Sequence, residues 1–396
     1  MRKILYAIPL SLDYRLPYYE KLKELSNGEF HLLHSIKRYE QLNRLDLVEK
    51  YRRRMGENVH ELHGEQVFNT YTFSFKKFDR EKGKNIPIPI GLWRAIKSVN
   101  PNVLITEGFF QWTPIVILYA WLHKIPVFMG YERTPWTERN TNCIKTLHRK
   151  ITDKFISGYL VNGSETKKYL ISIGVDEKKI HIGGMCADSA GLVSDIAGMD
   201  KQERESLRRK YVSNGGLLYL FTGQIVVRKG VKYLIEAWKS HALTFPEDAL
   251  VLIGCGDLYD HFVKETEAMP SVHFEGMIPY DEVYKYYAIA DVAVMPTIED
   301  NWSLVVPEAM ACGLPVATSI YNGCHVELVK EGENGFVFDT FDVNSVVKAL
   351  GAFHHCDLYK MGECSKRLEQ PFNTKNCASR SLNAIVEYLT DKEKNE

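Results

Sequence analysis

Short apolar runs of strand length alternate with amphipathic stretches of helix length along most of the chain. In the first part the pattern predicts strands over 3–8, 102–106, 125–130, 159–162 and 180–182, and helices over 18–25, 114–123 and 164–174. The alternation then restarts, with strands over 217–222, 249–253, 272–274, 292–296 and 315–319, and helices over 230–239, 259–267, 281–290 and near 325–330. Such alternation is typical of parallel sheets covered by helices on both faces. Two series predict two doubly wound α/β domains, with a ligand in the cleft beyond the carboxyl ends of the strands.

The chain of 396 residues is long enough for two domains. A polar, charged run over 197–214 is the expected connection between them. Near the end of the chain, apolar side chains recur at helical spacing and predict a terminal helix over 372–389, at Ala378, Leu382, Ile385 and Leu389. We therefore expect a first domain over 1–196, a second over 197–370 and a terminal helical segment over 371–396.

Two carboxylates, Asp300 and Glu308, are separated by seven residues. The helix between them can begin after Ser303, a good N-cap residue, or nearer Pro307, which is tolerated in a first turn. Gly313 is the expected helix end. Asp300 should therefore lie in the loop and Glu308 in the helix, so that both acids can reach one ligand.

A second motif, over 222–230, follows a predicted strand and opens a helix. Gly223 permits a tight turn, and Arg228 and Lys229 stand just before the helix begins. The free N–H groups and dipole at a helix start attract anions. Two added cations would make a clamp for a diphosphate, the group that leaves when a nucleoside-diphosphate sugar reacts.

The segment Asp-Asn-Trp-Ser-x-x-x-x-Glu over 300–308 resembles the acid-x7-acid signature of family 4 nucleotide-sugar glycosyltransferases, whose usual form is Glu-x-Phe-Gly-x-x-x-x-Glu. Four more segments resemble the family's in the same order, at 222–230, 253–257, 274–279 and 319–328. The chain departs from the family at Asp300, at Ser303 and at Gln224, where the family commonly has Arg. The resemblance implies a GT-B fold, in which two Rossmann-like domains face each other across a cleft and the C-terminal helix crosses back onto the first domain.

The resemblance also implies roles for particular residues. Glu308 would hold the ribose hydroxyls, Asp300 would lie near the donor sugar, and the Ser303 and Leu304 amides would meet the diphosphate. The whole donor-binding set comprises Gly223, Gly254, Gly256, Ile278, Ser303, Leu304, Glu308 and Gly323. The catalytic candidates are Arg228, Lys229, Asp300 and Glu132.

The first half of the chain matches the family less closely. The family's Gly-Gly turn after the first strand is replaced by a segment that contains Arg15, which could meet a phosphate of donor or acceptor. The alternative is that Arg15 is an exposed surface arginine with no ligand-binding role. Glu132 follows a predicted strand at the place where relatives often carry a His or an acid beside the acceptor. These departures affect the acceptor site more than the donor site.

The activity implied by the resemblance is a retaining sugar transfer, without a metal or a further cofactor, to a glycan or lipid-linked acceptor. A sugar-nucleotide 2-epimerase is one alternative, although the Asp300/Glu308 segment argues against it. An inactive nucleotide-sugar-binding partner subunit is another. A nicotinamide dehydrogenase is more distant, because Tyr259 stands where the third fingerprint glycine would be.

Charge and cysteine usage bear on partners and location. Residues 1–200 carry 30 basic and 22 acidic side chains, a difference of +8, which leaves −8 for the second half. The basic segments 38–54 and 76–84 could lie on an anionic membrane, or they could be a surface helix and a charged hairpin. Eight cysteines without a Cys-x-x-Cys pair argue against a disulfide framework or a zinc site. We expect a cytoplasmic protein, with a peripheral place on the inner membrane face as the alternative, and no nucleic-acid partner.

Overall fold

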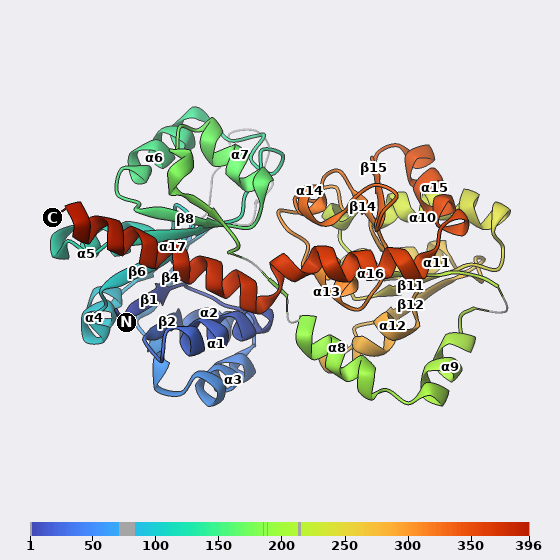
Figure 1. Cartoon of the computed structure of the whole chain (residues 1–396), viewed down its shortest axis with the longest axis horizontal. Helices are drawn as coiled ribbons and strands as arrows, with labels where there is room; N and C mark the ends of the chain where they lie inside the picture. The colour runs from blue at the N-terminus through green and yellow to red at the C-terminus, as the bar shows by residue number, and fades with distance from the viewer. Residues whose placement is uncertain (1, 71–83, 185, 188, 213–214, 396) are drawn as a thin grey trace.

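The computed structural model describes the chain except for residues 1, 71–83, 185, 188, 213–214 and 396. Two parallel sheets, each with helices on both faces, form two domains that stand side by side (Figure 1). A long C-terminal helix returns from the second domain to the first. The predicted fold, two doubly wound domains with a helix that crosses back, is confirmed.

The first domain is built on a seven-stranded parallel sheet of order β3-β2-β1-β6-β7-β8-β9. Its strands are β1 (Ile4–Ala7), β2 (Phe30–Ser35), β3 (Val59–Leu62), β6 (Val103–Glu107), β7 (Val127–Tyr131), β8 (Gly158–Val161) and β9 (Ile180–Ile182). Its helices are α1 (Leu16–Leu25), α2 (Ile36–Gln41), α3 (Leu45–Met55), α4 (Leu92–Val99), α5 (Thr113–His123), α6 (Cys143–Asp153) and α7 (Ser164–Ser172). An antiparallel pair, β4 (Glu65–Thr70) and β5 (Lys84–Pro89), stands apart from this sheet.

The second domain is built on a six-stranded sheet of order β12-β11-β10-β13-β14-β15. Its strands are β10 (Leu218–Thr222), β11 (Ala249–Ile253), β12 (Val272–Gly276), β13 (Val292–Met295), β14 (Val316–Ser319) and β15 (Gly335–Phe338). Its helices are α8 (Ser189–Gly198), α9 (Lys201–Arg209), α10 (Val231–Thr244), α11 (Tyr259–Glu265), α12 (Tyr284–Ile289), α13 (Val305–Ala311), α14 (His325–Leu328), α15 (Val343–Ala352) and α16 (Leu358–Glu369).

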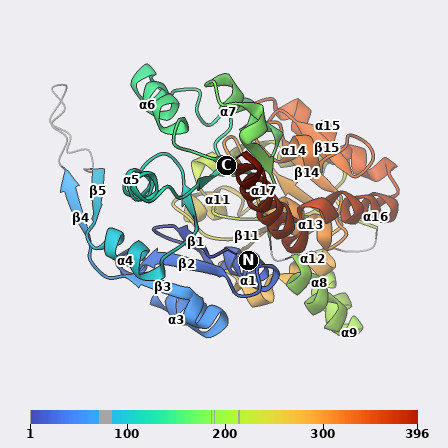
Figure 2. The same cartoon turned by 60° about the vertical axis from the view of Figure 1, so that its left-hand side comes forward.

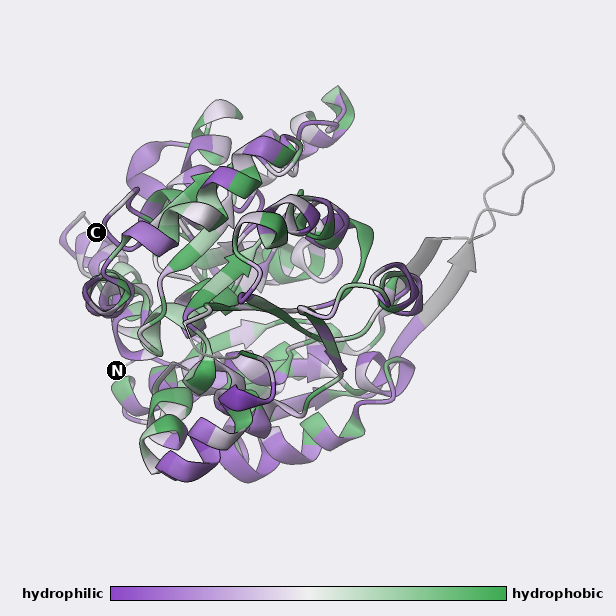
Figure 3. Cartoon of the chain, turned by 90° about the vertical axis from the view of Figure 1, so that its right-hand side faces the viewer, coloured by the Kyte–Doolittle hydropathy of each residue, from purple (hydrophilic) through white to green (hydrophobic). Residues whose placement is uncertain are grey.

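The central strands are apolar on both faces because helices cover both sides of each sheet. All five residues of β10 are buried, and so are all five of β11. Figure 3 shows the same distribution, with hydrophobic strands in the interior and hydrophilic positions on the outer faces of the helices. Continuous apolar runs of this kind are characteristic of buried parallel strands, which is why the sequence pattern located them.

Helix α17 (Thr374–Asn395) joins the two domains. It follows α16 across the molecule and lies on α1 of the first domain (Figure 1). Cys377, Leu382 and Ile385 are buried there in the same apolar cluster as residues of β1 and α1. The Tyr18 hydroxyl donates to Ser381 Oγ at 2.8 Å. The return of the chain therefore fixes the second domain to the first through buried contacts.

Several element boundaries differ from the sequence expectation. The helix after Asp300 begins at Val305 with Leu304 as its N-cap residue, so Ser303 does not cap it and Pro307 lies within its first turn. Gly313 does end this helix, with φ of +82°. The expected helix over 281–290 is a 3₁₀ turn, Tyr280–Glu282, followed by the shorter α12.

The chain enters the second domain earlier than the expected boundary at 196. That boundary falls inside α8, which packs against α12 and α13 of the second domain. Leu192 of α8 belongs to the second domain's apolar core. The change of domain therefore occurs between β9 and α8, and the polar run over 197–214 leads on through α9. The boundary at 370 stays a prediction.

The basic segment 38–54 forms the end of α2 and most of α3, and most of its arginines are bound by carboxylates of the protein. Four of them form ion pairs with nearby carboxylates: Arg38 with Glu65, Arg44 with Asp46, Arg52 with Glu61 and Arg54 with Glu20. Pairing reduces the charge that this surface can offer to lipid. The other basic segment, 76–84, falls almost entirely outside the described residues. In the part of the chain that is described, no helix combines the length and apolar content needed to cross a membrane.

The packing of α17 generates a stability prediction. Ile385→Ala should lower the free energy of unfolding by about 2–4 kcal/mol, because it leaves a cavity under a side chain that is 1% exposed. The exposed Glu387 lies two residues further along the same helix. Glu387→Ala should change the free energy by less than about 0.5 kcal/mol. Urea unfolding followed by circular dichroism measures both, and equal effects would contradict the packing of α17 on α1.

Candidate active site

A cleft of about 550 Å³ lies between the two domains, at the carboxyl ends of the second domain's strands. Its second-domain wall comes from the loops after β10 and β13 and from the start of α13. The first domain contributes the loop after β1, the start of α1 and part of α3. Seven of the residues predicted to hold the donor or act on it line this cleft: Gly223, Arg228, Lys229, Asp300, Ser303, Leu304 and Glu308.

The centre of the cleft is an ion pair between Lys229 and Asp300. Lys229 Nζ lies 2.5 Å from Asp300 Oδ2, and the two side chains are only 13% and 12% exposed. Arg228 is more open, at 49% exposed, and its guanidinium lies 3.8 Å from the same carboxylate oxygen. It also donates to the side chain of Gln224 at 3.3 Å. Two cations therefore converge on one acid, which leaves positive charge available to an anion in the cleft.

The loop that carries these cations is held by the loop after β13. The Arg228 carbonyl accepts hydrogen bonds from Ile298 N and from Thr297 Oγ1, both at 2.9 Å. Gly230 follows with φ of +70°, and a Cβ there would stand 1.9 Å from the Pro296 carbonyl oxygen. The turn therefore needs glycine for its backbone angle and for its close approach to the neighbouring loop.

Glu308 lies in α13 and is 6% exposed. Its two carboxylate oxygens accept hydrogen bonds from the hydroxyls of Tyr280 and Tyr287, each at 3.0 Å. Tyr287 is buried, whereas Tyr280 lines the cleft and is 42% exposed. Burial, reinforced by the charge of Glu308, raises the pKa of Tyr287 well above its usual value, so this phenol remains a hydrogen-bond donor. The hydroxyl of Tyr280, a side chain that lines the cleft, occupies the place on Glu308 that a ligand hydroxyl could take.

The remaining predicted donor residues lie near the cleft without lining it. A Cβ on Gly254 would stand 1.9 Å from Gly223 O, and one on Gly256 would stand 2.5 Å from Ile225 O. The close approach of two loops accounts for both glycines. Ile278 packs against the second domain's core.

Two predicted backbone contacts are occupied by the protein itself. Gly323 N donates to the Asp300 carbonyl at 3.0 Å. Ser303 N donates to Asn322 Oδ1 at 3.2 Å. These amides hold the loops after β13 and β14 together, so a phosphate could reach them only by replacing an existing hydrogen bond.

Arg15 and Glu132, the two first-domain candidates, contact each other. The Arg15 guanidinium forms ion pairs with Glu132 and, at 2.7 Å, with Glu107. Arg15 is 8% exposed, so the reading as an exposed arginine is wrong. Burial, reinforced by Glu132 and opposed by Arg15, raises the pKa of Glu107 to about 7. One arginine therefore faces two carboxylates, Glu107 and Glu132, in this cluster.

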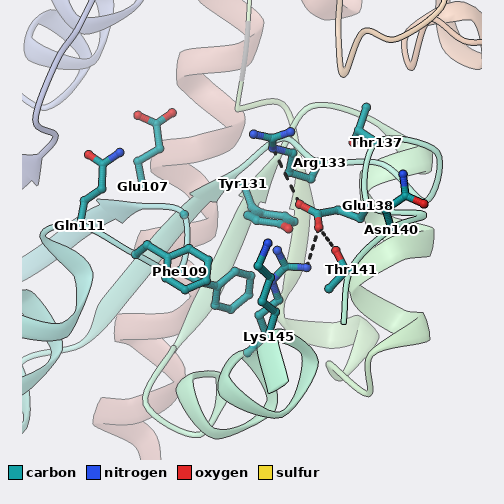
Figure 4. A pocket seen from close by; sticks show the side chains of 13 residues that line it. Glu107, Phe109, Gln111, Tyr131, Arg133, Thr137, Glu138, Asn140, Thr141 and Lys145 are labelled. Atoms are coloured by element: carbon teal, nitrogen blue, oxygen red, sulfur yellow. Dashed lines mark hydrogen bonds and ion pairs between the residues drawn. The ribbon is translucent and has the colours of Figure 1, made fainter. Parts of the chain in front are cut away.

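A second pocket, of about 430 Å³, opens at the carboxyl ends of β6 and β7 in the first domain. Figure 4 shows Glu107 and Gln111 on one side of it and Glu138 on the other. Glu138 binds Arg149 at 2.9 Å, approaches Arg133 at 3.8 Å and accepts a hydrogen bond from the Thr141 hydroxyl. The pocket is lined mostly by polar and charged side chains, and the sequence motifs did not locate it.

The domains also touch beside the cleft. Trp136 Nε1 donates to the Ile298 carbonyl at 2.8 Å, and its ring lies 4.5 Å from that of Tyr321. The carboxylate of Glu327 in α14 accepts hydrogen bonds from the backbone N–H and hydroxyl of Ser164 at the start of α7. The loop that precedes Asp300 is therefore supported from the first domain.

Among the described residues, one group has side chains close enough to hold a metal ion: His241, Asp248 and His354. Both histidine Nε2 atoms lie within hydrogen-bond distance of Asp248 Oδ2, at 2.8 and 2.7 Å. Asp248 directly precedes β11, so the group lies at the amino ends of the strands, whereas the cleft lies at their carboxyl ends. Each histidine is hydrogen-bonded to Asp248 through Nε2, and none of the three residues lines the cleft.

Comparison with known proteins relates the second domain to glycosyltransferases. Residues 203–368 match the family model described as glycosyl transferases group 1. Sulfoquinovosyl transferase SQD2 of Arabidopsis thaliana is 26% identical over 339 residues, which cover 79% of this chain and 63% of that protein. A GDP-mannose-dependent alpha-(1-6)-phosphatidylinositol monomannoside mannosyltransferase of Mycolicibacterium smegmatis is 28% identical over 171 residues, 41% of this chain and 44% of the relative. The chain thus spans less than two thirds of the length of these relatives.

Solved structures match over nearly the whole chain. Anabaena Alr3699/HepE in complex with UDP superposes with a TM-score of 0.73 at 13% identity, covering 97% of this chain and 100% of that one. Sucrose-phosphate synthase from Thermosynechococcus elongatus gives 0.67 at 15% identity, covering 98% and 100%. At these identities the likeness establishes the fold, which is GT-B.

The Arg15 cluster generates a prediction about pH. Because the folded-state pKa of Glu107 lies above the value of about 4.3 in an unfolded chain, its contribution to stability is present below about pH 4 and is lost as the pH rises toward 7. Glu107→Gln removes this titration, so the free energy of unfolding should fall less between pH 5 and pH 8 than in the wild type. Urea titrations at both pH values measure it. The exposed Glu24→Gln is the control, and unchanged pH dependence in Glu107→Gln would refute the assignment.

Proposed function

We propose that this protein is a glycosyltransferase that moves a sugar from a nucleoside-diphosphate sugar to an acceptor hydroxyl. The observation that carries the proposal is the convergence of Arg228, Lys229 and Glu308 in one cleft of a GT-B fold. Two cations suit a departing diphosphate, and a carboxylate with one exposed hydroxyl partner suits a ribose. The group 1 family match and the transferase relatives support the same activity.

We further propose that the transfer retains configuration, as in family 4, and needs no resident metal. In this mechanism the donor C1–O bond loosens toward an oxocarbenium-like state, and the diphosphate takes the negative charge. Arg228 and Lys229 stabilise that charge in place of a metal ion. The acceptor oxygen bonds to C1 on the face from which the diphosphate leaves, and its proton passes to the departing phosphate.

The ion pairs of Asp300 and Glu132 support a mechanism in which neither carboxylate is the nucleophile or the base. Asp300 is held by Lys229, and Glu132 is held by Arg15. A carboxylate that acted as nucleophile or base would first have to give up its ion pair. In this account Asp300 orients Lys229 toward the diphosphate, and Glu132 orients the first-domain wall.

The acceptor is proposed to be a glycan or a lipid-linked sugar that enters from the first domain. The pocket beside Glu107 and Glu138 is lined by hydrogen-bonding side chains, as a hydroxyl-rich acceptor requires. A phosphatidylinositol mannoside appears in the name of one relative, which is consistent with a lipid-linked acceptor here.

A thermal-shift panel tests donor binding. One of UDP, GDP, ADP and dTDP, at a concentration about 100 times its dissociation constant, should stabilise the protein by about 2.7 kcal/mol. The shift should be the same with EDTA as with magnesium, because the clamp consists of side chains. No shift with any nucleotide would contradict the donor site, and a shift that needs magnesium would contradict the metal-free mechanism.

Substitution of the clamp tests catalysis. Lys229→Ala should lower kcat by about 10²–10³-fold, the usual cost of removing one charge-stabilising group. Lys232→Ala, an exposed lysine one turn further along, is the matched control and should retain full activity. Release of nucleoside diphosphate from the sugar nucleotide identified by the panel measures turnover. Equal activity of the two variants would refute the clamp, and release of nucleotide with an epimerised free sugar would indicate an epimerase.

A further inference from the structure

Helix α6 presents apolar side chains to solvent on one continuous face. Ile144, Leu147 and Ile151 are 73%, 59% and 51% exposed, and Phe155, just beyond the helix, is 43% exposed. Their spacing of three, four and four residues places them above one another on a helix. We call this row the α6 stripe. In an ordinary surface helix such a row would face the core.

The contacts between α6 and the rest of the first domain fix its rotation, so that the α6 stripe faces solvent. Arg149 and Thr152 on the opposite face are 4% and 8% exposed. Arg149 pairs with Glu138 and lies over the rings of Phe109 and Tyr169. The side chain of Asn142 caps the helix start by accepting from Lys145 N. The polar face is therefore the packed one, and the apolar face is held outward.

Positive charge borders the stripe. Lys145, Lys150 and Lys154 are exposed, and none has an ion-pair partner among the described residues. The acid of this helix, Asp153, is 18% exposed and is bound by Lys179. An apolar row edged by unpaired lysines, without a free carboxylate beside it, is complementary to an anionic lipid surface. In helix α3, by comparison, Arg52 and Arg54 are bound by the carboxylates of Glu61 and Glu20.

Helix α5 also exposes apolar side chains. Leu118, Trp121 and Leu122 are 50%, 64% and 56% exposed. Figure 2 shows α5 and α6 on the same side of the first domain, away from α16. Phe110, which leads into α5, stacks on His148 of α6 at 5.0 Å. Tryptophan beside aliphatic residues is typical of groups that sit at the membrane–water interface.

We propose that the outer faces of α5 and α6 dock the first domain on an anionic lipid bilayer. Aliphatic side chains of the stripe enter the interface, and Lys145, Lys150 and Lys154 meet lipid phosphates. Lys145 also lines the first-domain pocket, so docking brings that pocket next to lipid headgroups. The surface stands on its own geometry and does not depend on the proposed sugar transfer.

Vesicle sedimentation tests the docking surface. With phosphatidylcholine vesicles that contain about one third phosphatidylglycerol, the wild type should pellet at 50 mM salt, and less so at 500 mM. Leu147→Glu/Ile151→Glu should weaken binding at least about tenfold, because the new charges would have to enter the interface. Replacement of the three lysines by glutamine should weaken it on the order of 100-fold at low salt, from a factor of about 5 per lysine.

Matched controls keep the outcome clear. Leu243→Glu alters a leucine that is 86% exposed on the second domain and should leave vesicle binding unchanged. The circular dichroism spectrum and melting temperature of each variant report an intact fold independently of lipid and of nucleotide. The proposal is overturned if the wild type stays in solution with anionic vesicles, or if the stripe variant pellets as the wild type does. It is also overturned if the wild type is a dimer that this variant makes monomeric while vesicle binding is absent, since a second copy would then cover the stripe.

Discussion

The ion pair between Lys229 and Asp300 is the contact on which the cleft depends. Asp300 also binds the loop after β14, because its backbone N–H donates to the Tyr321 carbonyl and its carbonyl accepts from Gly323. One residue thus ties together the loops that follow β10, β13 and β14. With both side chains nearly buried, loss of Asp300 would leave the charge of Lys229 without its partner, and loss of Lys229 would leave Asp300 only the more distant Arg228. The arrangement holds a lysine at a fixed place in the cleft before any ligand arrives.

The electrostatics of the rest of the site follow the same pattern. Each acid that could serve as a nucleophile is engaged: Asp300 by Lys229, Glu132 by Arg15, and Glu308 by two tyrosines. The cation with the most open surface is Arg228. A site in which the carboxylates are already bonded and an arginine is exposed favours an anionic leaving group over nucleophilic attack by a carboxylate. This preorganisation is the physical basis of the proposed mechanism.

The sequence predicted the fold well where strands are buried on both faces, as in β10 and β11, because burial imposes a continuous apolar run. It missed β2, whose apolar run is interrupted by His31 and His34. It also missed α6, whose aliphatic residues face outward and whose inner face is polar. Arg228, Lys229 and Glu308 line one cleft, as their motifs predicted, because each motif is local and follows a strand of the same sheet. The partners of Arg15 lie 92 and 117 residues away, at Glu107 and Glu132, and only the assembled sheet brings them together.

The most direct test of the central claim is a crystal structure of the protein with the nucleoside diphosphate that it binds. The account predicts phosphate oxygens within hydrogen-bond distance of Arg228 and Lys229, and a ribose hydroxyl at Glu308 where the Tyr280 hydroxyl now lies. A nucleotide bound elsewhere on the protein, with this cleft free of it, would contradict the account.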